Sequence, residues 1–274
     1  MRICLLAALT LAACGSSPVA PDAPAKQPAP TSPPPSSTSP TSPTPPTSPP
    51  PAPADDTLAT SAGVVKIHPI NHATLRLEIA DKIVWIDPTT KADLTGPKAD
   101  LVLITDIHGD HHDPAGLDAV RKPESVIVAP KAVADKVPGA VALANGETRD
   151  LGFVRVEAIP MYNLTRGPAA GKLFHDKGRG NGYVLTVGDR RIYISGDTEC
   201  TPEMKALKNI DVAFVCMNLP YTMPPAEAAE CVAAFKPRIL YPYHYRDSNL
   251  DELTRPLADS GVEVRRRDWY ATPP

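Results

Sequence analysis

The sequence has little net charge, few cysteines and no long apolar run. Its 274 residues carry a formal charge of −3 with 42% apolar residues, which suits a globular protein and indicates no nucleic-acid footprint. The apolar stretch at the N-terminus has only about ten residues, fewer than a membrane span requires. Three cysteines lie in the C-terminal half, Cys200, Cys216 and Cys231; this odd number indicates no disulfide framework, and we expect Cys216 to pack in its apolar run.

Proline, in contrast, is abundant, and sixteen of the 34 prolines fall between Pro18 and Pro53. From Gly15 to about Ala62 the chain has almost no large apolar residue, so it cannot bury enough surface to offset the entropy of ordering. We therefore expect a disordered tether rich in polyproline II. A ligand for a proline-binding domain is the alternative.

The first residues, MRICLLAALTLAACGSS, combine a positive Arg2, a short apolar stretch and small residues before Cys14. This layout is typical of an export signal, with a buried core helix as the alternative. The segment Leu11–Cys14 resembles the lipobox of bacterial lipoproteins. The resemblance implies a signal peptide over residues 1–13, lipidation of Cys14, a linker over residues 14–62 and anchoring to a membrane. With Gly15 in place of Asp, it further implies the cell envelope, at the outer membrane facing the periplasm.

The remaining residues, 63–274, are enough for one domain with a substantial core. Apolar runs at residues 64–70, 74–80, 82–88, 101–105 and 125–130 predict strands, and a second set follows at 154–159, 182–187, 190–196, 211–217 and 238–245. Helical patterns fall near residues 114–121, 202–208, 224–235 and 249–258. Strands mixed with helices in two comparable halves predict an α/β sandwich.

Three of these strands end in residues that can bind a metal. The run at 101–105 leads into ITDIHGDHHD, the run at 190–196 leads into Asp197, and the run at 238–245 contains His244. Sites gather at the carboxyl ends of strands in α/β sheets. A lone His244 or a Gly-Asp turn would be unremarkable, but their recurrence at three strand ends predicts a shared site.

The spacing within ITDIHGDHHD indicates how its side chains point. In an extended segment Asp106, His108 and Asp110 would share one side, with Gly109 allowing the chain to turn. Asp113 followed by Pro114 is typical of a helix start, which leaves His111 at the strand-to-helix turn. The alternative is a polar loop before a helix. Carboxylates and imidazoles suit zinc, with manganese or iron also possible.

Asp87 follows the strand at 82–88. It is a candidate for a carboxylate that orients a metal-binding imidazole, or for a turn residue before Pro88.

In order, TDIHGDH, SGDTE and YPYHYR, with NHAT at Asn71–Thr74, resemble the metallo-β-lactamase fold hydrolases over about residues 64–246. The resemblance implies a four-layer αββα sandwich with a metal-bound hydroxide as nucleophile. Carried over by position, it implies six metal ligands: Asp106, His108, Asp110, His111, Asp197 and His244. Two departures stand out, since Asp106 replaces a histidine and Asn163 stands where a further histidine is expected. His175 is a substitute from a neighbouring loop, a substrate-binding residue or a solvent-facing one.

These departures fall on one metal position, so the site is expected to hold one or two ions. Asp110 and Asp197 would fix the metal, and a protonated His72 or His175 would assist the leaving group of an ester, lactone or phosphodiester. A metal-binding envelope protein that is catalytically weak or inactive is the alternative. β-Lactam hydrolysis is disfavoured because the three-histidine position of typical two-zinc lactamases is absent.

A small-molecule substrate is expected, but its identity does not follow from the residues. The loop after residue 161 contains Arg166, Lys172, Lys177 and Arg179, which either receive an anionic group or form a solvated basic loop. Three tyrosines are candidates to line the pocket, although packing roles are common at such positions: Tyr162, Tyr221 and Tyr245.

Overall fold

Two mixed sheets form the centre of the domain in the computed structural model, which describes residues 56–270. The first sheet contains, in spatial order, β1 (Thr57–Thr60), β2 (Gly63–Asn71), β3 (Thr74–Ile79), β4 (Lys82–Ile86), β5 (Leu101–Leu103), β6 (Val126–Ala129) and β7 (Val141–Ala142). The second contains β14 (Glu263–Val264), β13 (Ile239–Tyr243), β12 (Val212–Cys216), β11 (Arg190–Ile194), β10 (Gly180–Val187), β9 (Arg155–Met161) and β8 (Thr148–Asp150).

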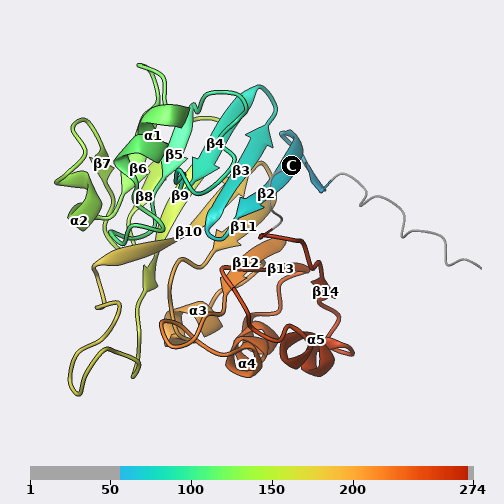
Figure 1. Ribbon diagram of the computed structural model, residues 1–274. Helices are drawn as coiled ribbons and strands as arrows, with labels where there is room; N and C mark the ends of the chain where they lie inside the picture. Colours follow the sequence, from blue (N-terminus) through green and yellow to red (C-terminus); the bar gives the residue numbers. More distant parts are fainter. Residues whose placement is uncertain (1–55, 271–274) are drawn as a thin grey trace, which may run out of the picture. The chain divides into compact units, whose positions relative to one another are not determined.

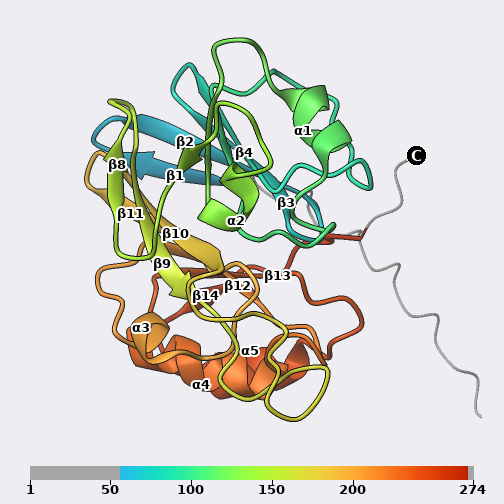
Figure 2. The same ribbon diagram turned by 90° about the vertical axis from the view of Figure 1, so that its left-hand side faces the viewer.

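The helices cover the outer faces of the two sheets (Figures 1 and 2). On the first sheet lie α1 (Pro114–Val120) and α2 (Lys131–Ala134). On the second lie α3 (Pro202–Lys205), α4 (Pro225–Phe235) and α5 (Asp251–Leu257). The four-layer αββα sandwich predicted from the sequence is therefore confirmed. No helix within residues 56–270 has the length and apolar character needed to cross a bilayer.

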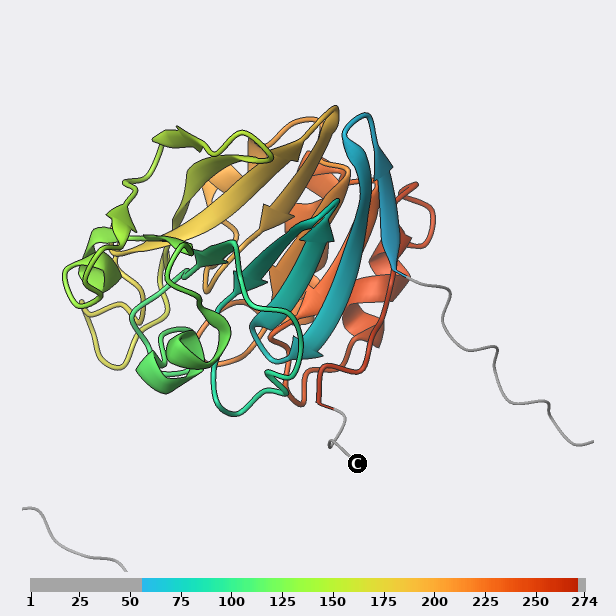
Figure 3. The same ribbon diagram turned by 90° about the horizontal axis from the view of Figure 1, so that it is seen from above.

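Burial follows the layers. On β3, Leu75, Leu77 and Ile79 alternate with partly exposed residues and face the core between the sheets, whereas every residue of β12 is buried because the sheet is covered on both faces there. A smaller cluster around Trp85 and Leu117 packs beneath α1. The first sheet (blue to green) lies against the second (yellow to orange) in Figure 3.

Each half changes from antiparallel to parallel pairing at its centre. Strands β1 to β4 and β8 to β11 pair antiparallel, and the strands that follow in each sheet pair parallel. The parallel set matters for the site, because the carboxyl ends of β11 and β13 then lie at the same edge.

The domain begins before residue 63, the N-terminal boundary expected from the sequence. Residues 57–60 form β1, which pairs with β2 and buries Leu58, so the fold starts before residue 63. Four short elements were also missed, α2, β7, β8 and β14, because they have only two to four residues and no readable period. The expected signal peptide, Cys14 and most of the linker lie outside the described residues.

Candidate metal centre

The three strand ends meet at one edge of the sandwich, and a hairpin turn adds a fourth group. Asp197 follows β11, His244 follows β13, residues 106–111 follow β5, and His72 lies in the turn between β2 and β3. Three sets of side chains each place one ligand atom per residue within 4.8 Å of the others. The sets are His111, Asp197 and His244; His72, Asp110 and His244; and Asp106, His108 and His175.

The Asp197 carboxylate belongs to the first set and also lies close to His175 of the third. Its Oδ1 is 3.3 Å from His244 Nε2, and its Oδ2 is 3.3 Å from His111 Nε2 and 3.5 Å from His175 Nε2. Two ligands of one tetrahedral zinc ion lie roughly 3.3 Å apart, given bonds of about 2.0 Å. The spacing therefore fits a shared metal ligand.

Several atoms facing this point are buried without a hydrogen-bond partner among the described residues. They are His111 Nε2, His244 Nε2 and Asp197 Oδ1. Buried polar atoms are normally paired, because leaving one unsatisfied costs about 1–3 kcal/mol. A divalent cation fits these residues, since it would satisfy all three atoms.

The segment after β5 does not run extended, contrary to the sequence expectation. The His108 carbonyl accepts hydrogen bonds from the N–H groups of His111 and His112, so the chain turns there. The turn sends Asp106 and His108 to one set and Asp110 and His111 to the others. The Asp113 side chain accepts from Ala115 N–H at 3.0 Å, which confirms the predicted start of α1.

His175, rather than Asn163, lies with Asp106 and His108. The His175 Nε2 is 3.9 Å from Asp106 Oδ2, while its Nδ1 lies 2.8 Å from Asn163 Oδ1. The Asn163 amide nitrogen in turn donates to Glu199 and to the Tyr221 carbonyl. Asn163 therefore orients His175 and has no free atom for a metal.

Arg179 is the cation closest to this set. Its guanidinium contacts both oxygens of Asp106 at 3.2 and 3.3 Å and comes within 3.5 Å of His108 Nε2. The positive charge of Arg179 balances the negative charge of Asp106. Arg179 thus faces the metal centre, where its contacts are to Asp106 and His108.

Four residues of the site have left-handed backbone conformations: His72 (φ 54°), Asp87 (φ 44°), His244 (φ 51°) and Arg246 (φ 42°). Such angles are uncommon for residues other than glycine and cost about 1–3 kcal/mol each. Two hydrogen bonds hold His72 and His244 in place, from His244 N–H to the His72 carbonyl and from His72 N–H to the Trp269 carbonyl. Gly196 (φ 61°), where an added Cβ would meet Met161, makes the turn into Asp197.

The two buried carboxylates of the three sets, Asp197 and Asp106, are ionised, as binding of a cation requires. Burial would raise the pKa of Asp197, but the positive charges of His244 and His111 hold it well below its usual range. Burial likewise opposes ionisation of Asp106, yet the His108 hydrogen bond and nearby charges lower its pKa to about 2. Burial lowers the pKa of His72 to about 4 and also lowers that of His175. Despite burial, Asp197 and Asp87 raise the pKa of His111, and the hydrogen bond to Asp106 raises that of His108, so a cation bound here would displace protons from these imidazoles. At His72 and His175 the lowered pKa disfavours the protonated form expected of a proton donor.

The remaining candidates separate into pocket residues and structural ones. Tyr221 packs edge-on against Phe174 and lines a hollow beside His108, His175 and His244. Tyr162 instead donates to Glu203, and Tyr245 donates to the Arg267 carbonyl. These two tyrosines stabilise the fold and do not line this hollow or the cavity beside His72.

The basic loop is largely neutralised. Arg166 pairs with Glu199 and Glu227, and Lys177 pairs with Glu203. With Arg179 held on Asp106, only Lys172 of the four expected cations forms no ion pair within the described residues.

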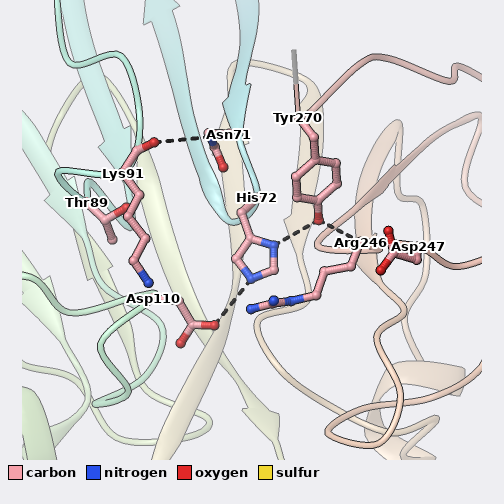
Figure 4. A pocket seen from close by; sticks show the side chains of 8 residues that line it. All are labelled: Asn71, His72, Thr89, Lys91, Asp110, Arg246, Asp247 and Tyr270. Carbon is pink, nitrogen blue, oxygen red and sulfur yellow. Dashed lines mark hydrogen bonds and ion pairs between the residues drawn. The ribbon is translucent and has the colours of Figure 1, made fainter. Parts of the chain in front are cut away.

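Sequence reasoning missed Lys91, Arg246 and Tyr270, which line a cavity beside His72 and Asp110 (Figure 4). Arg246 lies two residues after the candidate ligand His244, so its position in the sequence could have indicated that it lies near the site. Lys91 and Tyr270 carry no such signal, because folding alone brings them to the site.

Comparison with known proteins agrees with this geometry. Residues 66–244 match the family model described as "Beta-lactamase superfamily domain". A "UPF0173 metal-dependent hydrolase" of Thermococcus onnurineus is 29% identical over 197 residues, which cover 66% of this chain and 85% of the relative. A crystal structure of a protein assigned as a metal-dependent hydrolase, from Parabacteroides distasonis, is 43% identical with a TM-score of 0.74, covering 78% of this chain and 98% of the other.

A more distant structure supports the fold alone. Igni18, a metallo hydrolase of Ignicoccus hospitalis, has a TM-score of 0.60 at 21% identity and covers 74% of this chain and 94% of its own. The match of the family model, together with these relatives and the converging histidines and aspartates, shows that the chain belongs to the β-lactamase superfamily and is a metal-dependent hydrolase of the metallo-β-lactamase fold.

Proposed function

We propose that the protein hydrolyses an ester, lactone or phosphodiester bond in a small molecule, using one or two divalent ions, with zinc as the first choice and manganese or iron as alternatives. The observation that carries the proposal is the set of buried, unpartnered ligand atoms on His111, His244 and Asp197. These atoms face one another and suit one cation.

The candidate ligands fall into two groups, one for each ion. Asp110, His111, Asp197 and His244 are assigned to one ion, and Asp106, His108 and His175 to a second, with Asp197 next to both. A divalent ion bound here supplies Lewis acidity, which lowers the pKa of a coordinated water toward about 7 and polarises the bond under attack. Asp87 and Asn163 hold the imidazoles of His111 and His175 in orientation.

Metal analysis and a substrate screen test this assignment. The full chain, purified without chelator, should contain between about half an ion and two ions per molecule, and should hydrolyse at least one of a panel of acyl esters, lactones and phosphodiesters. Asp197→Asn and His244→Ala should lose metal and turnover, while Asp118→Asn and His112→Ala, outside the three sets, should not. A folded, metal-free protein in which all four variants behave alike would overturn it.

A catalytically weak or inactive metal-binding protein is the second candidate. Asp106 in place of histidine, held by Arg179, is the observation that favours it. Full metal content without turnover on any substrate class would support this candidate against the first.

For location, we propose export and lipid anchoring at Cys14 in the bacterial envelope, at the outer membrane facing the periplasm. The Cys200–Cys231 disulfide supports an oxidising compartment. Expression of the full chain with a labelled fatty acid should label the wild type but not Cys14→Ser, and membrane fractionation should release only the variant. Equal labelling or release of both would contradict the anchor.

A further inference from the structure

A cavity of about 490 Å³ opens directly beside the metal centre. Its wall includes His72 and Asp110, and Figure 4 shows both side chains at its centre. Asp110 and Arg246 also line the hollow that reaches Phe174 and Tyr221. The two hollows therefore share walls, and a substrate at the metal centre can extend into either.

Two cations enter this cavity from different parts of the chain. Lys91 comes from the segment after β4 and Arg246 from the segment after β13. Figure 4 shows the ammonium and the guanidinium directed toward Asp110 from opposite sides. Neither forms an ion pair within 4.0 Å among residues 56–270.

The carboxylates of the cavity do not neutralise both cations. Asp110 faces His72 at 3.3 Å and His244 at 3.6 Å, where the metal centre lies. Asp247 lines the same wall without pairing to Arg246. Lys91 and Arg246 are both exposed, so solvent partly screens them, but two positive charges at one cavity still attract an anion.

The backbones of both residues are held by residues adjoining the metal centre. The Asn71 amide donates to the Lys91 carbonyl at 3.2 Å. The Tyr270 hydroxyl accepts from Arg246 N–H at 2.8 Å and lies 2.8 Å from His72 Nδ1. The backbones of Lys91 and Arg246 are thus fixed relative to His72, whereas the basic loop after β9 is engaged with glutamates and Asp106.

We propose that Lys91 and Arg246 form an anion subsite, so that the substrate carries a carboxylate or phosphate group separate from the bond that is cleaved. The uncharged part of the substrate lies toward Phe174 and Tyr221. The proposal rests on the hydrolase function proposed above and adds the substrate class.

A matched pair of esters tests the subsite. 4-Nitrophenyl hydrogen glutarate and 4-nitrophenyl pentanoate have acyl chains of equal length and differ in one carboxylate. The metal-loaded full chain should prefer the glutarate by about tenfold or more in kcat/KM, and Lys91→Gln and Arg246→Gln should each remove most of that preference through KM. Lys131→Gln and Arg255→Gln, which remove one surface charge outside both hollows, should retain it.

Inhibition separates the two anions. Glutarate and inorganic phosphate are compared as competitive inhibitors, and the anion whose inhibition weakens about tenfold in Arg246→Gln is the one the subsite binds. Equal hydrolysis of both esters, with inhibition unchanged in both variants, would overturn the subsite while leaving the hydrolase function intact.

If the wild type cleaves neither ester, calorimetry with inorganic phosphate and with glutarate on the metal-loaded protein decides the subsite independently of activity. Weaker binding of either anion by the two variants supports it. Equal binding by wild type and variants rejects it. Metal content and Tm of each variant confirm that the fold is intact.

Discussion

The buried carboxylate of Asp87 lies 2.8 Å from His111 Nδ1, and Thr105 donates to the same carboxylate from its N–H and its hydroxyl. The arrangement turns His111 Nε2 toward Asp197, 3.3 Å away. A turn residue before Pro88, as the sequence also allowed, would not make these contacts.

Asp87→Asn should weaken metal binding without unfolding the protein. The amide keeps the shape but loses the charge that holds the His111 ring, and losses of this kind are typically about 10- to 100-fold in affinity. Competition against a chromogenic chelator measures it, with Asp118→Asn as the control. Unchanged affinity would mean that packing alone orients His111.

His175→Ala should lose the more weakly held ion, whereas Asn163→Ala should keep it with affinity reduced by about tenfold. The reason is that His175 Nε2 is a candidate metal ligand together with Asp106 and His108, whereas Asn163 only contacts His175 Nδ1. Metal content at increasing zinc concentration distinguishes the two variants. The reverse order would show that Asn163 is the ligand.

Arg179→Gln should strengthen binding at the set containing Asp106 by about tenfold or more, because it removes a positive charge 3.2 Å from that carboxylate. Arg255→Gln controls for overall charge. Weaker binding in Arg179→Gln would instead mean that the guanidinium is needed to position Asp106.

Removing the metal should lower Tm. A ligand that binds only the folded state stabilises it by about 2.7 kcal/mol at a free concentration 100 times its Kd. Calorimetry before and after chelation measures the shift, and Asp197→Asn should show little of it. Identical shifts in wild type and variant would point to a chelator effect away from the site.

Breaking the disulfide should destabilise the second half of the domain. Cys200 and Cys231 are 31 residues apart and join the segment after Asp197 to α4, and a loop of that length is worth about 3–4 kcal/mol in the chain-entropy model. Denaturant unfolding of Cys200→Ser/Cys231→Ser measures the loss. A variant as stable as the wild type would mean that packing of α4 suffices.

Strands and helices with a clear hydrophobic period were predictable, because a buried face repeats every two or 3.6 residues whatever the rest of the chain does. Residues at strand ends were predictable for a related reason, since parallel strands bring their carboxyl ends to one edge. Asp197 and His244 are examples, and the edge of β11 and β13 brings them to 3.3 Å.

Side-chain direction within a turn was not predictable. Alternation would have sent Asp106, His108 and Asp110 to one side, but the hydrogen bonds to the His108 carbonyl divide them between sets. The partners of the basic loop were not predictable either. Arg166 pairs with Glu199, before α3, and with Glu227 of α4, and Lys177 pairs with Glu203 of α3.

The sequence by itself determined an α/β sandwich and the strand ends that carry ligands, because both depend on local pattern and spacing. The αββα class and the unusual Asp106 followed from the resemblance of its motifs to the metallo-β-lactamase fold hydrolases. Only the tertiary structure decided that His175 rather than Asn163 lies with Asp106, that Arg179 balances Asp106, and that Lys91, Arg246 and Tyr270 surround a cavity beside His72. These contacts join residues up to 198 positions apart, and their geometry depends on how two separately patterned sheets pack together.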